Sequence, residues 1–193
     1  PAAWDGMIQA VADGQFMIAG DGISITPKRD EIVDFSDPYI VLQQRLLVAA
    51  GNSTVTSAAD IQNGDFRVAT QKGTTNYELA VELFGADKVD AYDEFAFSIS
   101  AVISGDADAA IVDEVAGLGY MGANKDKVKL VGEGLQTDPL GFAFPEGSAL
   151  VDVINQGLAY MDSNGKLQEI NDKFFSPGFT VGYDDIAEVT YDE

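Results

Sequence analysis

The chain has no cysteine and no histidine, and only 11 of its 193 residues are lysine or arginine. It therefore has no thiol nucleophile, no imidazole base and none of the ligands that favour zinc or haem, so we expect neither a cofactor nor a bound metal. Its 32 Asp and Glu residues give a formal charge of -21. A surface of that sign repels nucleic acid and anionic lipids, which argues against both as partners.

Long apolar runs are also missing. No stretch approaches the roughly 18 residues that a membrane-spanning helix needs, and no basic, apolar leader opens the chain, so we expect no direct membrane insertion. The chain begins at Pro1 rather than Met, which we interpret as a mature piece, processed or incomplete at its start. Hydrophobic residues still make up 46% of it, enough to build a core in one domain or two small lobes.

A regular alternation of strands and helices fills the middle of the chain. It predicts a mainly parallel α/β sheet with helices on both faces. Two extended connectors, near 46–51 and 136–141, bracket this unit and predict two lobes with a hinge. A short strand is expected earlier, at 15–20. The alternating unit comprises strands at 66–71, 88–92, 107–113 and 128–132 and helices at 74–84, 94–105 and 114–125.

Arg29 is the first polar feature that indicates a binding site. Thr26 can cap a helical turn that starts at Pro27, which would hold Arg29 five residues after Ser24. A guanidinium matches a carboxylate with two parallel hydrogen bonds, and a serine hydroxyl can add a third. An ordinary surface ion pair would explain the same arginine.

Two further features lie where predicted strands end and helices begin. Gly73 leads into a helix that Thr74 or Thr75 can cap, and such a helix start suits an anion. Asp113 ends an apolar strand, where its carboxylate could receive an ammonium group. Plain N-caps would account for both features. Together, however, a guanidinium, a helix N-terminus and a carboxylate at one cleft match the charges of an α-amino acid zwitterion.

Four stretches carry a resemblance to a known family. In order, they are GDGISITPKRDEIVDFSDPY, QKGTTNYELA, GDADAAIVD and LGFAFPEGSALVDVINQGLAYMDSNGKLQEINDKFF. They resemble the polar amino-acid-binding proteins of ABC transporters, the family 3 extracellular solute-binding proteins, over about 170 residues. The resemblance implies a two-lobed type II periplasmic-binding-protein fold, with lobe 1 at 1–48 and 139–193 and lobe 2 at 49–138.

The resemblance also implies roles for individual residues. By matched position, Arg29 would hold the α-carboxylate of a free amino acid, with hydrogen bonds from Ser24 and from the amide of Thr75. Gly22 would offer its carbonyl to the α-ammonium, and Asp113 its carboxylate. Other matched positions are Thr74, in the same loop, and Gln71 and Asn76, which often face the ligand side chain and favour a polar ligand.

The family pattern further implies a non-enzymatic, periplasmic or extracellular protein that delivers its ligand to an ABC permease. Family members begin some 50 to 60 residues earlier, so lobe 1 is expected to be incomplete, any membrane anchor would lie in the missing segment, and the protein is expected to be a monomer unless swapping or assembly fills the gap. The tail motif FTVGYDD has strand-like alternation and is one candidate to do so. Two alternatives remain, namely a cyclohexadienyl dehydratase-like enzyme and a truncated sensory or assembly module.

Overall fold

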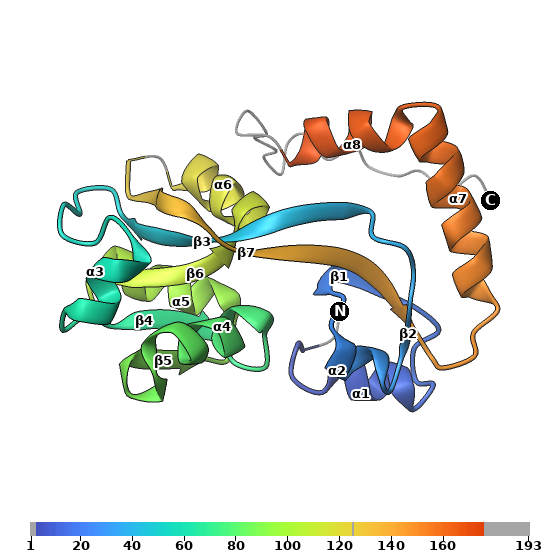
Figure 1. Cartoon of the computed structure of the whole chain (residues 1–193), viewed down its shortest axis with the longest axis horizontal. Helices are drawn as coiled ribbons and strands as arrows, with labels where there is room; N and C mark the ends of the chain where they lie inside the picture. Colours follow the sequence, from blue (N-terminus) through green and yellow to red (C-terminus); the bar gives the residue numbers. More distant parts are fainter. Residues whose placement is uncertain (1–2, 125, 176–193) are drawn as a thin grey trace, which may run out of the picture.

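The computed structural model describes residues 3–124 and 126–175. Its centre is a seven-stranded sheet in the order β1-β7-β3-β6-β4-β5, with β2 also paired to β7 (Figure 1). The strands are β1 (Ala19–Ser24), β2 (Asp34–Phe35), β3 (Ile40–Ala49), β4 (Val68–Gln71), β5 (Val89–Tyr92), β6 (Ala109–Asp113) and β7 (Val128–Phe144).

The helices lie around this sheet and mostly begin where the sequence predicts. Thr26 caps α2 through its hydroxyl, with Pro27 in the first turn, as expected. The helices are α1 (Met7–Ala12), α2 (Pro27–Asp30), α3 (Ala58–Asn63), α4 (Thr75–Phe84), α5 (Phe95–Ser104), α6 (Glu114–Ala123), α7 (Leu150–Ser163) and α8 (Lys166–Phe174), with a 3-10 turn, η1 (Ala86–Lys88).

Two long strands, β3 and β7, run through both halves of the molecule and pair antiparallel (Figure 1). The sheet as a whole is mixed. Within the predicted unit, β4 pairs parallel with β5 and β6 as expected, whereas β3, which precedes that unit in the chain, lies antiparallel between β6 and β7. The two predicted connectors are extended, but they belong to these strands. The hydrogen bonds between β3 and β7 make the sheet continuous across the middle of the molecule.

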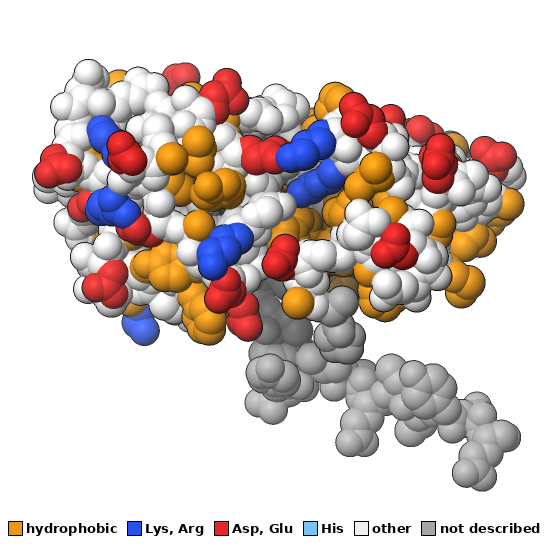
Figure 2. Space-filling model, turned by 90° about the horizontal axis from the view of Figure 1, so that it is seen from below, with side chains coloured by type: hydrophobic (Ala, Val, Ile, Leu, Met, Phe, Trp, Pro, Cys, Tyr) orange, Lys and Arg blue, Asp and Glu red, His pale blue; other side chains and the backbone are white. Residues whose placement is uncertain are grey.

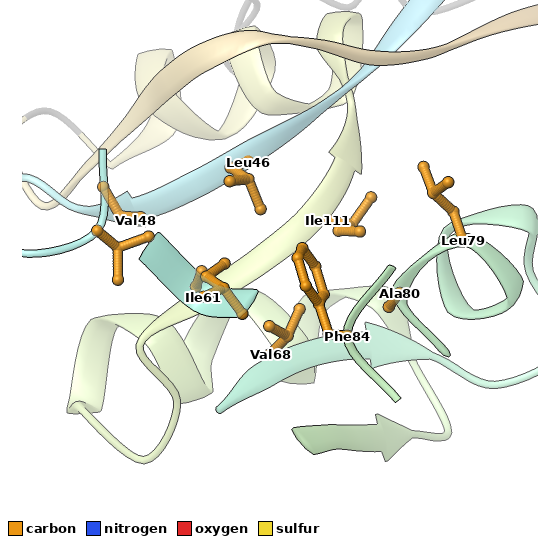
Figure 3. Packing of buried hydrophobic residues seen from close by; sticks show 10 residues of the cluster. Leu46, Val48, Ile61, Val68, Leu79, Ala80, Phe84 and Ile111 are labelled. Carbon is orange, nitrogen blue, oxygen red and sulfur yellow. The ribbon is translucent and has the colours of Figure 1, made fainter. Parts of the chain in front are cut away.

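Alternating side chains of the same strands build cores on both faces of the larger half. Leu46 and Ile111 point to one face, where they pack with Phe84 of α4 and Ile61 of α3 (Figure 3). Leu47 belongs instead to the cluster on the other face, with residues of α5. Because successive strand residues face opposite sides, continuous apolar runs are what a sheet covered on both faces requires.

The smaller half has its own cluster around α1 and the β1 end of the sheet. Met7 and Val11 of α1 pack there with Ile23, as the helical spacing predicts. The short strand expected at 15–20 begins later, since pairing with β7 starts only at Ala19. Before it, the Met17 side chain is 74% exposed, so apolar character alone did not locate the strand.

Helices α7 and α8 lie along the outside of the smaller half (Figure 1). None of their residues is buried, and Tyr160 is 70% exposed. Hydrogen bonds attach them: the Asp37 amide donates to Asn155 Oδ1 (2.8 Å), and Asn171 Nδ2 donates to the Tyr39 carbonyl (3.1 Å). The predicted FTVGYDD strand lies outside the described residues.

Acidic side chains are spread over both halves of the face shown in Figure 2. This distribution fits the solvated, acidic surface that the composition predicts. Among the described residues, no helix combines the length and apolar character that crossing a membrane requires.

Candidate functional site

A cavity of about 490 Å³ lies where the two halves meet. Every predicted site residue except Arg29 lines it, and so do several aromatic residues. The lining residues are Trp4, Asp21, Gly22, Ser24, Tyr39, Gln71, Thr74, Thr75, Asn76, Phe95, Asp113, Val115, Ala116, Gly119, Leu140, Phe174 and Phe175.

Arg29 lies directly behind this lining. Its Nη1 donates to the Ser24 carbonyl (2.9 Å) and its Nη2 to the Gly73 carbonyl (3.4 Å), so it bridges β1 and the start of α4. Its guanidinium carbon lies 5.4 Å from the centre of the Trp4 ring, a cation–π contact. Burial lowers the pKa of Arg29, while the negative charges of nearby carboxylates raise it. An arginine so perturbed still carries its charge.

The start of α4 forms the wall opposite β1. Thr74 is the N-cap: its hydroxyl accepts from the Tyr77 amide (3.1 Å) and donates to the Gln71 carbonyl (2.7 Å). Gly73, at φ 70°, makes the turn that precedes it. The capping explanation of Thr74 is thus correct, and the cap also brings the first-turn residues Thr75 and Asn76 to the cavity. First-turn amides have no partner within the helix and favour an anion.

A carboxylate that the sequence analysis missed joins the two walls. Asp138 is buried, and its Oδ2 accepts from Ser24 Oγ (2.8 Å), from Gln44 Nε2 (3.1 Å) and, more weakly, from Thr75 Oγ1 (3.4 Å). The Ser24 and Thr75 hydroxyls also lie 3.0 Å apart. Since an ionised carboxylate can only accept, Ser24 donates its single proton to Asp138 and accepts from Thr75.

Asp113 does not act as a side-chain cap of α6, although it occupies the N-cap position. Its Oδ1 instead accepts from Asn76 Nδ2 (3.0 Å), which orients the carboxylate at the cavity wall. Burial raises the pKa of Asp113 to about 6; the negative charge of Asp138 adds to the rise, while Asn76 and Arg29 oppose it. A carboxylate held in this way attracts a cation.

The amides expected to face a ligand are already engaged within the protein. Gln71 Nε2 donates to the Asp93 carbonyl (3.0 Å), and Asn76 supports Asp113. The aromatic residues Trp4 and Phe95 line the cavity without having been singled out from the sequence. Only the position of Phe95 at the start of the helix predicted at 94–105 could have suggested this, and that signal is weak.

Residues 1–177 match the family model of the bacterial extracellular solute-binding proteins, family 3. The chain belongs to this family. This agrees with the resemblance noted in the sequence and with the two-lobed fold.

Individual relatives agree with this assignment. The chain is 30% identical to the L-cystine-binding protein TcyJ of Escherichia coli K12 over 183 residues, which are 93% of this chain and 68% of the relative. Among solved structures, an ancestral arginine-binding protein bound to glutamine matches with a TM-score of 0.82 and 33% identity, covering 91% of this chain and 78% of the other. The ancestral amino acid-binding protein AncCDT-1, described as a precursor of cyclohexadienyl dehydratase, matches with a TM-score of 0.82 and 35% identity, covering 91% and 76%.

Proposed function

We propose that this solute-binding protein captures a free amino acid between its two lobes and delivers it to an ABC permease. The observation that carries the proposal is that the N-terminus of α4 and Asp113 line one cavity, with Arg29 directly behind its wall. These three features match a carboxylate and an ammonium on neighbouring atoms of one ligand. The names of the relatives, which include cystine-, glutamine- and arginine-binding proteins, support an amino acid as the ligand.

Each recognition group has an assigned part. Arg29 uses its remaining N–H groups for the α-carboxylate, together with the amide of Thr75. Asp113 and the Gly22 carbonyl receive the α-ammonium. Ser24 reaches the ligand by turning its hydroxyl away from Asp138, whereas Asn76 holds Asp113 in place. Thr74 fixes the helix start, and Gln71 fixes the neighbouring loop to Asp93.

We expect the cleft to close on the ligand because the residues that bind it lie on different lobes. Residues 1–48 and 139–193 form lobe 1 in this proposal, and 49–138 form lobe 2. Arg29 then lies on one lobe and Asp113 on the other, so a single amino acid satisfies both only when the lobes close, and binding shifts the equilibrium towards closure. We place the protein outside the cytoplasmic membrane as a monomer.

The chain's single tryptophan makes the proposal simple to test. Trp4 lines the cavity and packs over Arg29, so its fluorescence should change when an amino acid binds. We expect a subset of the standard amino acids to give saturable changes at micromolar concentration. The absence of any response, together with no heat in calorimetry, would refute the proposal.

A matched pair of variants tests the role of Arg29. Arg29→Ala should weaken binding by on the order of 2 to 5 kcal/mol, or at least about thirtyfold in Kd, because it leaves a buried ligand charge unpaired. Arg67→Ala is the control, since Arg67 is exposed and pairs with Asp90 away from the cavity. Equal losses in the two variants would point to a general effect on folding and contradict the assigned role.

A dehydratase activity on a cyclohexadienyl acid is the second candidate. The structure supplies a second acid beside Asp113, because the negative charge of Asp138 lies close enough to raise the pKa of Asp113. A carboxyl group with a pKa near 6 can act as a general acid. Incubation with arogenate or prephenate decides the matter: we expect no turnover, and product formation that Asp113→Asn abolishes would establish the enzyme.

A further inference from the structure

The charged side chains that line the cavity, within the described part of the chain, are Asp21 and Asp113, and both are acidic. Arg29 supplies the positive charge behind the wall. The cavity and its immediate surroundings therefore carry more negative than positive charge, even before the buried Asp138 is included.

The α-carboxylate and α-ammonium of a bound amino acid can pair with only two of the three charged side chains Asp21, Arg29 and Asp113. This step rests on the proposed function, in which Arg29 takes the α-carboxylate and Asp113 the α-ammonium. Asp21 then remains. It is exposed on β1, lines the cavity, and makes no salt bridge with any described residue. Closing the cleft over an unpaired carboxylate would be unfavourable, so a ligand that brings a matching charge is preferred.

Tyr39 lines the same cavity as the carboxylates of Asp21 and Asp113. Burial raises the pKa of the Tyr39 hydroxyl, and the negative charges of Asp21 and Asp113 both add to that rise. A ligand whose ammonium groups reach both acids would extend across Tyr39.

The aromatic walls favour the same kind of ligand. Trp4, Tyr39 and Phe95 line the cavity, and aromatic faces attract guanidinium and ammonium groups. The Trp4 ring already contacts the guanidinium of Arg29 in this way. The volume of about 490 Å³ lies within the range of small-molecule sites and leaves room for a long side chain.

We propose that the cavity selects α-amino acids with a positively charged side chain, of the arginine and lysine type, and that Asp21 is the residue that recognises that charge. An acidic ligand would place its side-chain carboxylate beside Asp21 and is excluded by repulsion. A neutral ligand of the same size fills the cavity but leaves Asp21 unpaired. This proposal takes the place of the polar or acidic ligand that Gln71 and Asn76 favour in the sequence, because both amides are engaged within the protein.

The experiment compares L-arginine with L-citrulline, which has nearly the same shape but a neutral ureido group. Calorimetry on the full chain should give a Kd for arginine at least about tenfold lower than for citrulline, equivalent to about 1.4 kcal/mol. Asp21→Asn should remove most of that difference by weakening arginine binding and leaving citrulline binding within about twofold. Raising the salt concentration should weaken arginine binding more than citrulline binding.

Asp152→Asn is the matched control, because Asp152 is exposed on α7 and does not line the cavity. It should leave both affinities unchanged. Equal affinity for arginine and citrulline, or an equal effect of Asp21→Asn on both, overturns the proposal. Binding of glutamine or another neutral amino acid without arginine refutes the charge preference and leaves the proposed function standing. Failure of every amino acid to bind refutes both.

Discussion

Replacing Asp113 with asparagine should stabilise the folded chain at neutral pH while it removes amino-acid binding. Burial raises the pKa of Asp113 from 3.8 to about 6. At 1.36 kcal/mol per pKa unit, holding this carboxylate ionised costs the folded state about 3 kcal/mol relative to the unfolded chain. Asparagine avoids that cost and keeps an oxygen that can accept from Asn76.

The sign of the pH dependence follows from the direction of the shift. Because the folded state holds the Asp113 proton more tightly than the unfolded state, protonation favours folding. This contribution is fully present below about pH 4 and is lost as pH rises through about 6. The stability advantage of Asp113→Asn should therefore be larger at pH 8 than at pH 4 by about 2.5 kcal/mol, because at pH 4 the unfolded chain is already partly ionised at this residue.

Urea denaturation of both proteins at the two pH values measures this difference, and subtracting one protein from the other cancels the titration of all other groups. Asp152→Asn serves as the control, because Asp152 is exposed on α7 and does not line the cavity. A constant stability difference for Asp113→Asn, or one that grows towards low pH, would refute the reasoning about burial.

Two other predictions follow from the same contacts. Because an ammonium requires the ionised form of Asp113, the Kd for the amino acid should rise about tenfold between pH 8 and pH 5, and a flat profile in calorimetry would exclude Asp113 from the site. Thr74→Val should lower the free energy of unfolding by about 1 kcal/mol through loss of the α4 cap. Thr54→Val, at an exposed threonine outside the helices and strands, is the control and should cost much less, so equal losses in denaturant unfolding would contradict the assignment of Thr74 as the cap.

Local sequence signals located much of the fold and most of the cavity wall. Thr26 with Pro27, and Gly73 with Thr74, are turn and cap patterns that depend on neighbouring residues only, and the structure has them where they are expected. Side chains fixed by such patterns could be assigned to the cavity before the fold was known.

Long-range pairing was harder to predict. The position of β3 between β6 and β7 depends on which strands meet, and no local pattern specifies that. Asp138 was missed for the same reason: its partner Ser24 is 114 residues away in the chain. Asp21 lies beside residues that were singled out, but its significance depends on the charge balance of the assembled cavity.

Blocking the α-carboxylate or the α-ammonium of the ligand tests most directly whether the cavity recognises an amino acid by its two charged ends. Calorimetry should compare the amino acid that binds best with its methyl ester, which lacks the carboxylate charge, and with its N-acetyl form, which lacks the ammonium. If Arg29 and Asp113 recognise a zwitterion, each modification should weaken binding at least about a hundredfold, as expected when a buried charge loses its partner. Comparable affinity for all three compounds would show that the cavity does not recognise an amino acid by its charged ends.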